Sequence, residues 1–137
     1  MGIEVTVDHL GDVQFEIKAR GHAILCDQPI ESHGHDEGMT PPELMLASLA
    51  SCAAFYAADY LKRMKIATGG THVRVTADKV LAPARLDNFQ IEVEVPVELC
   101  EEHREGLERA VHRCLIHNTL MQPPTIGLAI KSVIAAV

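Results

Sequence analysis

Two cysteines occupy positions that could support thiol chemistry. Cys52 lies in a run of small apolar residues, 47–54, which leaves space for a substrate or a partner thiol to approach its sulfur. Cys114 points inward from a second amphipathic segment, together with Leu107 and Val111. If the two segments pack together, one thiolate could attack a peroxide and the other could resolve the product as a disulfide. The alternative is a structural role, since free cysteine is among the most buried residue types.

A metal site is a second hypothesis, centred on one charged loop. The stretch His33-Gly34-His35-Asp36-Glu37 gathers metal-ligand side chains, with His22 and Cys26 upstream. No Cys-x2-Cys pair or second close histidine pair accompanies them, as zinc sites usually require. Charged loops often collect such residues by chance, so we expect neither a metal nor a cofactor.

Other residue types near the two cysteines have simpler interpretations. His117 follows Cys114 by three positions and could polarise its thiol as a base, or pack as an interface histidine. Cys26 ends a predicted strand and Cys100 lies near a predicted helix start. We assign no role to either.

Alternation of apolar and polar residues predicts the strands that must position these side chains. The N-terminal part should form a meander with a turn at Gly11-Asp12, and a long loop over 27–40 should follow. The predicted strands are 3–8, 13–18, 22–26, 71–80 and 89–97, the last two joined by a loop containing Pro83 and Asp87-Asn88.

Two helices carry the cysteines. Thr40-Pro41-Pro42-Glu43 predicts a helix start, with Thr40 as N-cap and Glu43 as its capping-box partner. Residues 44–58 are apolar or small almost all the way round, which predicts a helix buried on every side. Acidic residues near 98–102 begin the second helix, and Pro123-Pro124 ends it.

A final strand over 125–133 completes the order β-β-β-α-β-β-α-β. This pattern is typical of the α+β class, and no repeat or linker divides it. We therefore expect one domain over residues 1–137.

Charge and composition limit the partners. A formal charge of -7 without a basic run argues against nucleic acid. No signal peptide and no apolar span of about 18 residues is visible, so we expect no membrane and a cytoplasmic protein with reduced thiols. Aromatic residues make up only 4 % of the chain, so its core buries little area per residue and oligomerisation is a reasonable expectation.

Two motifs resemble the signatures of the OsmC/Ohr family, named for osmotically inducible and organic hydroperoxide resistance proteins. Asp27-x-Pro29, residues 40–44 and residues 49–52 resemble the first signature, and residues 113–119 resemble the second. The element order and the spacing of the cysteines are similar too, so the resemblance covers nearly the whole chain.

The resemblance implies an intertwined homodimer with a central buried helix and two active sites at the interface. It implies that Cys52 attacks an organic or lipid hydroperoxide and becomes a sulfenic acid. Cys114 then condenses with it to a disulfide, and a dithiol reductant, such as a lipoylated protein, resets the pair. Oxidative-stress defence by a Cys-based peroxidase is the activity that follows.

Glu43 is the third candidate catalytic residue. The peroxidases of the family place a glutamate ten residues before the reactive cysteine, and here Glu43 stands nine before Cys52. Nine helical residues span roughly 13 Å and about half a revolution, so Glu43 cannot touch its own Cys52. It would act from the partner subunit, or it would only complete the cap at Thr40.

The second function class is a binding module. The family's peroxidases carry an arginine in the first β-turn to hold the thiolate, where this chain has Gly11-Asp12. Arg20, in the next turn, is the nearest substitute. A cysteine buried among Ala and Leu without a cation is a poor nucleophile. The same interface pocket could therefore hold a small hydrophobic ligand without turnover.

Overall fold

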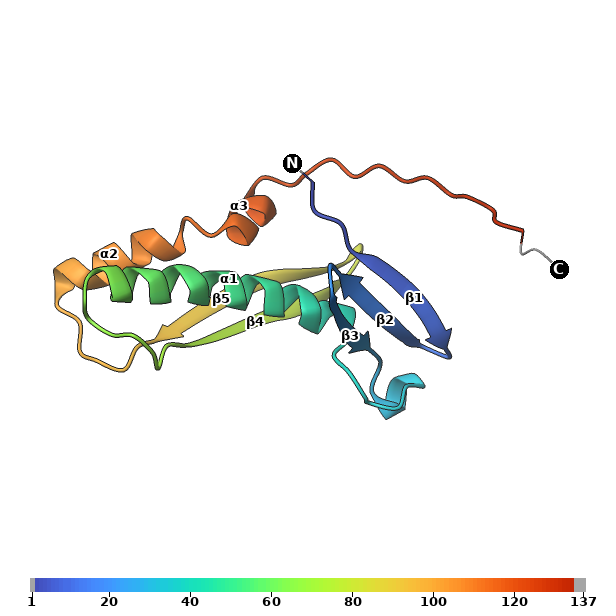
Figure 1. Cartoon of the computed structure of the whole chain (residues 1–137), viewed down its shortest axis with the longest axis horizontal. Coiled ribbons are helices and arrows are strands. Elements are labelled where there is room, and N and C mark those ends of the chain that lie inside the picture. Colours follow the sequence, from blue (N-terminus) through green and yellow to red (C-terminus); the bar gives the residue numbers. More distant parts are fainter. Residues whose placement is uncertain (1, 135–137) are drawn as a thin grey trace.

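The computed structural model describes residues 2–134 and begins with a three-stranded antiparallel meander (Figure 1). Its strands are β1 (Thr6–Gly11), β2 (Gln14–Ala19) and β3 (His22–Cys26). The β1–β2 turn at Gly11-Asp12 forms as predicted, because both residues adopt positive φ angles, 138° and 47°. Val7, Ile17 and Ile24 pair across the three strands, and Val7 and Ile24 are 54% and 47% exposed.

Helix α1 (Pro41–Arg63) starts where the sequence predicts. Thr40 is the N-cap: the backbone N–H of Glu43 donates to its hydroxyl oxygen, and Glu43 Oε1 accepts from the backbone N–H of Thr40. This capping box satisfies two backbone donors that the first helical turn leaves without partners.

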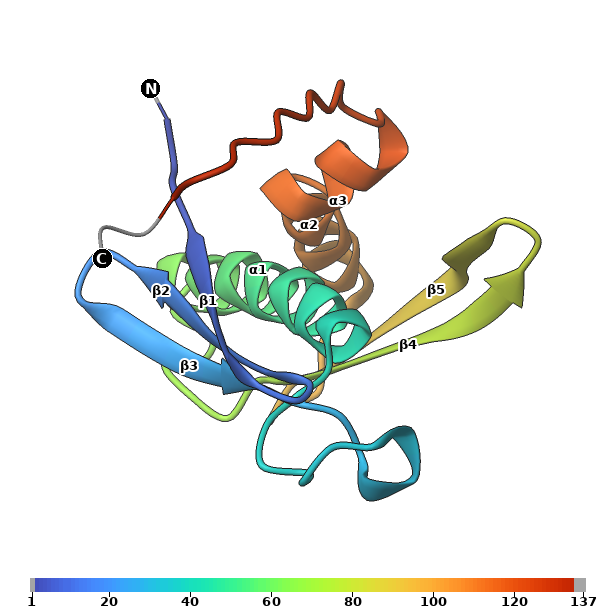
Figure 2. The same cartoon turned by 90° about the vertical axis from the view of Figure 1, so that its right-hand side faces the viewer.

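A long hairpin of β4 (His72–Leu81) and β5 (Ala84–Glu94) follows α1 and projects beyond it (Figure 2). The loop between β4 and β5 is shorter than predicted, since Asp87 and Asn88 belong to β5. Asp87 pairs with Asp78, and the register shifts between Thr76 and Asp78. This register shift is a β-bulge, and it lets a residue with positive φ, Asn88, lie within the strand.

The core lies where α1 crosses the hairpin and helix α2 (Glu101–Val111) (Figure 1). Its buried members come from the last turns of α1 and the middle of α2; they are Ala57, Tyr60, Leu61, Leu107 and Ala110. Tyr60 and His103 share a hydrogen bond of 3.0 Å between the phenol oxygen and Nδ1. A Cβ on Gly106 would lie only 2.1 Å from the Tyr60 oxygen, so this close helix crossing requires glycine.

The second predicted helix is broken in two. Helix α2 ends at Val111, and a separate helix α3 (Leu115–Met121) begins after Cys114. Cys114 has φ -56° and ψ 126°, which is not helical, and it is the N-cap of α3. Its sulfur accepts the backbone N–H of His117 in place of an intrahelical bond. The cysteine therefore sits in the break between two helices.

The predicted final strand over 125–133 is not formed. Residues 123–134 are extended and run away from the helices (Figure 1), but they pair with no strand. Ile126, Leu128 and Ile130 are 89%, 87% and 89% exposed. The alternating pattern is that of a half-buried strand, yet the single chain offers no sheet edge beside it.

Helix α1 is also less buried than predicted. Phe55 is 66% exposed and Met45 is 40% exposed, because β4, β5, α2 and α3 cover only part of its circumference. By length and composition, α1 is the single helix within residues 2–134 that could cross a membrane. The core helix of a globular protein has the same composition, and α1 packs on the hairpin here.

Candidate functional site

The side chains of Cys52 and Cys114 lie near each other within one chain, close enough for Cys52 to shift the pKa of Cys114. Cys52 lies on α1, and Cys114 immediately precedes α3. Both are free thiols. Cys114 is fully buried, whereas Cys52 is partly exposed. The structure thus brings together the two cysteines that the sequence singles out.

The surroundings of Cys114 favour its protonated form. Burial raises the pKa of the Cys114 thiol, and the hydrogen bond and negative charge of Cys52 raise it further. The backbone N–H groups of His117 and Ile116 oppose this shift, the first at 3.4 Å from the sulfur. Cys114 therefore favours its protonated thiol form. Only Cys52 is both in the pair and open to solvent.

Glu43 lies at the start of α1 and is engaged in the cap. Its Oε1 accepts from the backbone N–H and the hydroxyl of Thr40, both at 2.9 Å. These two hydrogen bonds lower the pKa of the Glu43 carboxyl, with a smaller contribution from the charge of Lys79. Glu43 is exposed and ionised, and its observed contacts are those of a capping residue.

Asp27, from the first signature, is a buried carboxylate that organises the loop 28–39. It accepts hydrogen bonds from Gln14 Nε2 at 3.0 Å and from the backbone N–H groups of Gln28, His35 and Glu37 at 2.7, 3.2 and 3.1 Å. The hydrogen bond from Gln14, followed by those from the backbone, holds the pKa of Asp27 at about 2. Charge stabilisation by these donors outweighs the cost of burial.

The remaining sequence candidates lie apart from the thiol pair. His35 Nε2 is 3.6 Å from an Asp12 carboxylate oxygen, and no cluster of three metal-ligand side chains occurs among residues 2–134. Cys26 is buried at the end of β3, and Cys100 is the exposed N-cap of α2. Arg20 is exposed in the β2–β3 turn with φ 56°.

An apolar hollow of about 460 Å³ lies next to the thiol pair, between α1, β5 and α3. Leu49, one turn before Cys52, forms part of its wall, and His117, one turn after Cys114, forms another part. Its apolar lining consists of Met45, Leu49, Leu86, Phe89, Ile91, Leu120 and Met121. The hollow can hold a hydrophobic group about one helical turn from each cysteine.

A polar hollow of about 510 Å³ lies on the other side of α3. Tyr56, one turn after Cys52, and Arg113, the neighbour of Cys114, both line it. The rest of its wall consists of Leu115, Asn118, Thr119, Gln122 and Pro124. The sequence analysis did not single out Arg113, which directly precedes Cys114.

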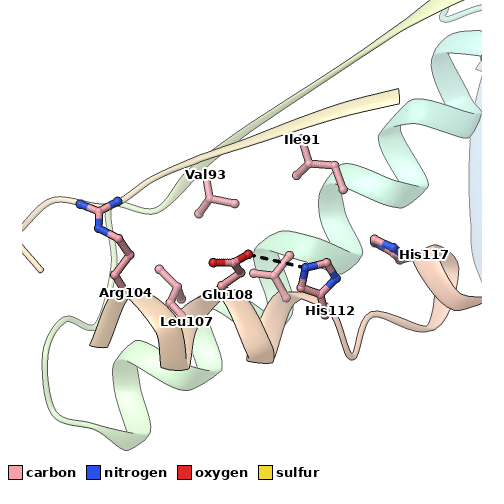
Figure 3. Close-up of a pocket in the computed structure, with 8 residues that line it drawn as sticks. Ile91, Val93, Arg104, Leu107, Glu108, His112 and His117 are labelled. Atoms are coloured by element: carbon pink, nitrogen blue, oxygen red, sulfur yellow. Dashed lines mark ion pairs between the residues drawn. The ribbon is translucent and has the colours of Figure 1, made fainter. Parts of the chain in front are cut away.

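A third hollow, of about 440 Å³, lies between β5 and α2 (Figure 3). Ile91 and Val93 line it from the strand, and Arg104 stands at one end. Glu108 points toward His112, with 4.0 Å between carboxylate oxygen and Nε2. Arg104 also lines an adjoining hollow together with Glu98. Arg104 and one glutamate, Glu108 or Glu98, therefore line each of these two hollows.

Comparison with known structures shows the same fold in several bacterial proteins. An osmotic stress induced and detoxification response protein from Psychrobacter arcticus superposes with a TM-score of 0.78 at 23% identity, over 87% of this chain and 89% of the other. An OsmC-like protein from Mycoplasma pneumoniae gives 0.71 at 21% identity, over 90% and 89%. An organic hydroperoxide resistance protein OsmC from Legionella pneumophila gives 0.60 at 16%, over 88% and 89%.

No curated protein matches the sequence. The family model for OsmC-like proteins, however, matches residues 34–129, a span that contains α1, the β4–β5 hairpin, both helices that follow it and both cysteines of the pair. The match covers well over half of the chain, and the α+β fold agrees with it. The protein therefore belongs to the OsmC-like family.

Proposed function

We propose that this protein is a thiol peroxidase that reduces organic or lipid hydroperoxides in the cytoplasm. The observation that carries the proposal is the proximity of two free thiols, one partly exposed and one buried. A peroxidase of this type needs one sulfur that the peroxide can reach and a second sulfur within bonding reach of the first. Oxidative-stress defence is the corresponding role.

The chemistry proceeds in two steps. The Cys52 thiolate attacks the outer peroxide oxygen: an S–O bond forms, the O–O bond breaks, and the alkoxide takes a proton and leaves as an alcohol. Cys114 then attacks the sulfur of the Cys52 sulfenic acid, which forms the disulfide and releases water. A dithiol reductant, such as a lipoylated protein, returns both cysteines to thiols.

The apolar hollow supports an organic rather than an inorganic peroxide. Its wall includes Leu49, one turn from Cys52, and the bulky side chains of Phe89 and Leu120. Burying an alkyl or aryl group there gains roughly 25 cal/mol per Å² of apolar surface. Hydrogen peroxide has no group that could use this surface.

Stopped-flow oxidation of the reduced protein by cumene hydroperoxide and by hydrogen peroxide tests the proposal. We expect rapid thiol loss with the organic peroxide, ended by Cys52→Ser, and a trapped sulfenic acid in Cys114→Ser. Cys100→Ser removes an exposed thiol outside the pair and serves as the matched control. Oxidation no faster than that of a free thiol would contradict the peroxidase function.

The functional unit that we propose is a homodimer. Phe55 on α1 is 66% exposed, and Ile126, Leu128 and Ile130 expose about as much surface as they would in an unfolded chain. The extended segment 123–134 can add as a strand to an open sheet edge of a second copy, which covers these residues. Light scattering should therefore report a dimer, and Leu128→Asp with Ile130→Asp should weaken it. Ala129→Asp, on the opposite side of the segment, is the control.

One observation favours a second candidate function, a non-catalytic module that binds a small hydrophobic ligand. The β1–β2 turn carries Gly11-Asp12 and no arginine, so no cation of that turn can hold a thiolate. In that case a fluorescent hydrophobic probe would bind the apolar hollow, and Leu49→Asp would abolish binding, while peroxide oxidised Cys52 no faster than a free thiol.

A further inference from the structure

The apolar hollow carries two methionines whose chemistry the peroxidase steps above do not use. Met45, in the second turn of α1, and Met121, the last residue of α3, both line it. They are 40% and 71% exposed, so both are open to a solute that enters the apolar hollow. Two polarisable thioethers from separate helices thus share one apolar surface.

The thioethers belong to the wall itself, whereas the thiols lie beyond it. Met45 and Leu49 line the apolar hollow from α1, and Cys52 follows Leu49 by three residues. The spacing of four and then three residues places all three on one side of the helix. Met121 lies about two helical turns from Cys114, at the other end of α3. A hydrophobic group in the apolar hollow therefore lies directly against thioethers.

The other two methionines within residues 2–134 differ from this pair in position but not in exposure. Met39 ends the loop before α1 and Met64 is the C-cap of α1, and neither lines the apolar hollow. They are 48% and 43% exposed, between the values for Met45 and Met121. Solvent exposure alone predicts similar reactivity for all four methionines. A preference for the two in the wall must therefore come from an oxidant that binds there.

We propose, on the basis of the proposed function of this hollow, that Met45 and Met121 are a modification site: an organic hydroperoxide held in the apolar hollow oxidises their thioethers to sulfoxides. A thioether reacts without first losing a proton, so no neighbouring base or cation is needed. The reaction remains open when Cys52 is already part of the disulfide and offers no thiolate to the bound peroxide.

The step balances with the hydroperoxide as its only co-reactant. The thioether sulfur attacks the outer peroxide oxygen, an S–O bond forms and the O–O bond breaks. The proton of the hydroperoxide passes to the departing alkoxide, which leaves as an alcohol. The sulfur loses two electrons and the peroxide gains them. Methionine sulfoxide reductases, supplied with a thiol, return the sulfoxide to the thioether.

Oxidation changes what the apolar hollow can hold. A sulfoxide converts a flexible apolar side chain into a polar one, and covering its oxygen with hydrocarbon costs free energy. Two sulfoxides in the wall should therefore weaken the binding of hydrophobic groups. The protein would then stop collecting organic peroxide once its thiols are exhausted.

Mass spectrometry of Cys52→Ser tests the site without turnover of the thiol pair. The variant is treated with cumene hydroperoxide or with hydrogen peroxide, and the sulfoxide at each methionine is followed over time. Relative to Met39 and Met64, we expect the two wall methionines to react about fivefold faster with cumene hydroperoxide than with hydrogen peroxide, because only the organic peroxide concentrates in the apolar hollow. The preference should disappear in guanidinium chloride, which unfolds the protein. Equal ratios with both peroxides, or a preference that survives unfolding, would overturn the modification site.

Binding of the neutral fluorophore N-phenyl-1-naphthylamine to Cys52→Ser, before and after cumene hydroperoxide, tests the consequence. We expect about a tenfold loss of affinity, restored by methionine sulfoxide reductases A and B together. Adding Met45→Leu and Met121→Leu replaces both thioethers by hydrocarbon of similar size and should make the two affinities equal. Adding Met39→Leu and Met64→Leu instead is the matched control and should leave the loss unchanged.

Three results would contradict the consequence for binding. They are a loss of affinity that persists in the variant with Met45→Leu and Met121→Leu, an unchanged affinity after oxidation of both methionines, and no binding of the fluorophore before treatment. Failure of the peroxidase function would show separately, as slow loss of the Cys52 thiol in the wild type, because neither measurement above uses that thiol.

Discussion

The Asp27 loop and the thiol pair are both buried polar sites, but their neighbours satisfy them to different degrees. Asp27 accepts four hydrogen bonds, from Gln14 and from the backbone of Gln28, His35 and Glu37. These donors stabilise its charge, and the backbone donors tie the loop 28–39 to it.

The thiol pair has far fewer partners. Cys114 has its contact with Cys52 and weak backbone donors, of which His117 N–H lies 3.4 Å from the sulfur. A buried polar group whose hydrogen bonds are all formed stabilises the fold, because the loss of any of these bonds costs free energy. A group with few partners can change its bonding without that cost. The comparison therefore favours the thiol pair, rather than Asp27, as the place of the chemistry proposed above.

The largest expected effect on stability comes from Gly34→Ala, which should disrupt the hydrogen bonds around Asp27. A Cβ at Gly34 would lie 1.9 Å from the Gln28 carbonyl oxygen and 2.8 Å from Asp27 Oδ1, so the loop must move. We expect a loss of about 3 kcal/mol in the free energy of unfolding, measured by denaturant titration. Gly69→Ala, where nothing lies within 4 Å, is the control and should leave stability nearly unchanged. Equal stability of the two variants would show that the loop is not rigid.

The next effect is on the pH dependence of stability. Asp27 has a folded-state pKa of about 2 against an ordinary value of 3.8, so the folded state favours its ionised form. This contribution is complete above pH 4 and is lost as the pH falls through about 2. Melting temperatures measured between pH 5 and pH 2 should therefore fall more steeply in the wild type than in Asp27→Asn. Asp36→Asn, in the same loop but exposed, should keep the wild-type slope.

A smaller effect separates capping from catalysis at the start of α1. Thr40→Ala removes the N-cap and should cost about 1 kcal/mol of stability without slowing Cys52 oxidation. Glu43→Gln keeps the shape of the cap partner but removes its charge. If Glu43 only caps the helix, this variant lowers the melting temperature slightly and leaves the oxidation rate unchanged. A tenfold slower oxidation at unchanged stability would establish a catalytic Glu43 instead.

The smallest effect concerns the thiol pair and leaves the fold intact. Cys52 raises the pKa of Cys114 through its hydrogen bond and charge, in addition to burial. Replacing Cys52 by Ala should therefore move the alkylation of Cys114 to lower pH, when measured with iodoacetamide in a background of Cys26→Ser and Cys100→Ser. An unchanged or higher midpoint in Cys52→Ala would mean that the two sulfurs do not interact.

Local sequence signals predict the elements and the thiol contact well. The capping box at Thr40 and the turn at Gly11-Asp12 depend on neighbouring residues only, and both form as expected. The proximity of Cys52 and Cys114 requires only that α1 packs against the helices that follow the hairpin. Such features follow from short-range chemistry and from the apolar pattern.

Features that depend on distant or missing partners could not be predicted in this way. The break at Cys114 leaves Leu107 and Val111 at helical spacing with Cys114, so periodicity does not reveal it. The segment 125–133 has a strand pattern, yet the single chain supplies no edge for it. The burial of Asp27 depends on three backbone donors from a loop whose path has no sequence periodicity.

The break between α2 and α3 has a consequence for hydrogen exchange around the two sulfurs. Cys52 lies near the middle of a 23-residue helix, about three turns from either end, so its backbone amide should exchange only with global opening. Cys114 caps a helix of seven residues that leads into an unpaired extended segment, so amides of α3 should exchange by local opening. We therefore expect Cys52 to keep its position, and the motion that brings the two sulfurs into disulfide geometry to come from Cys114.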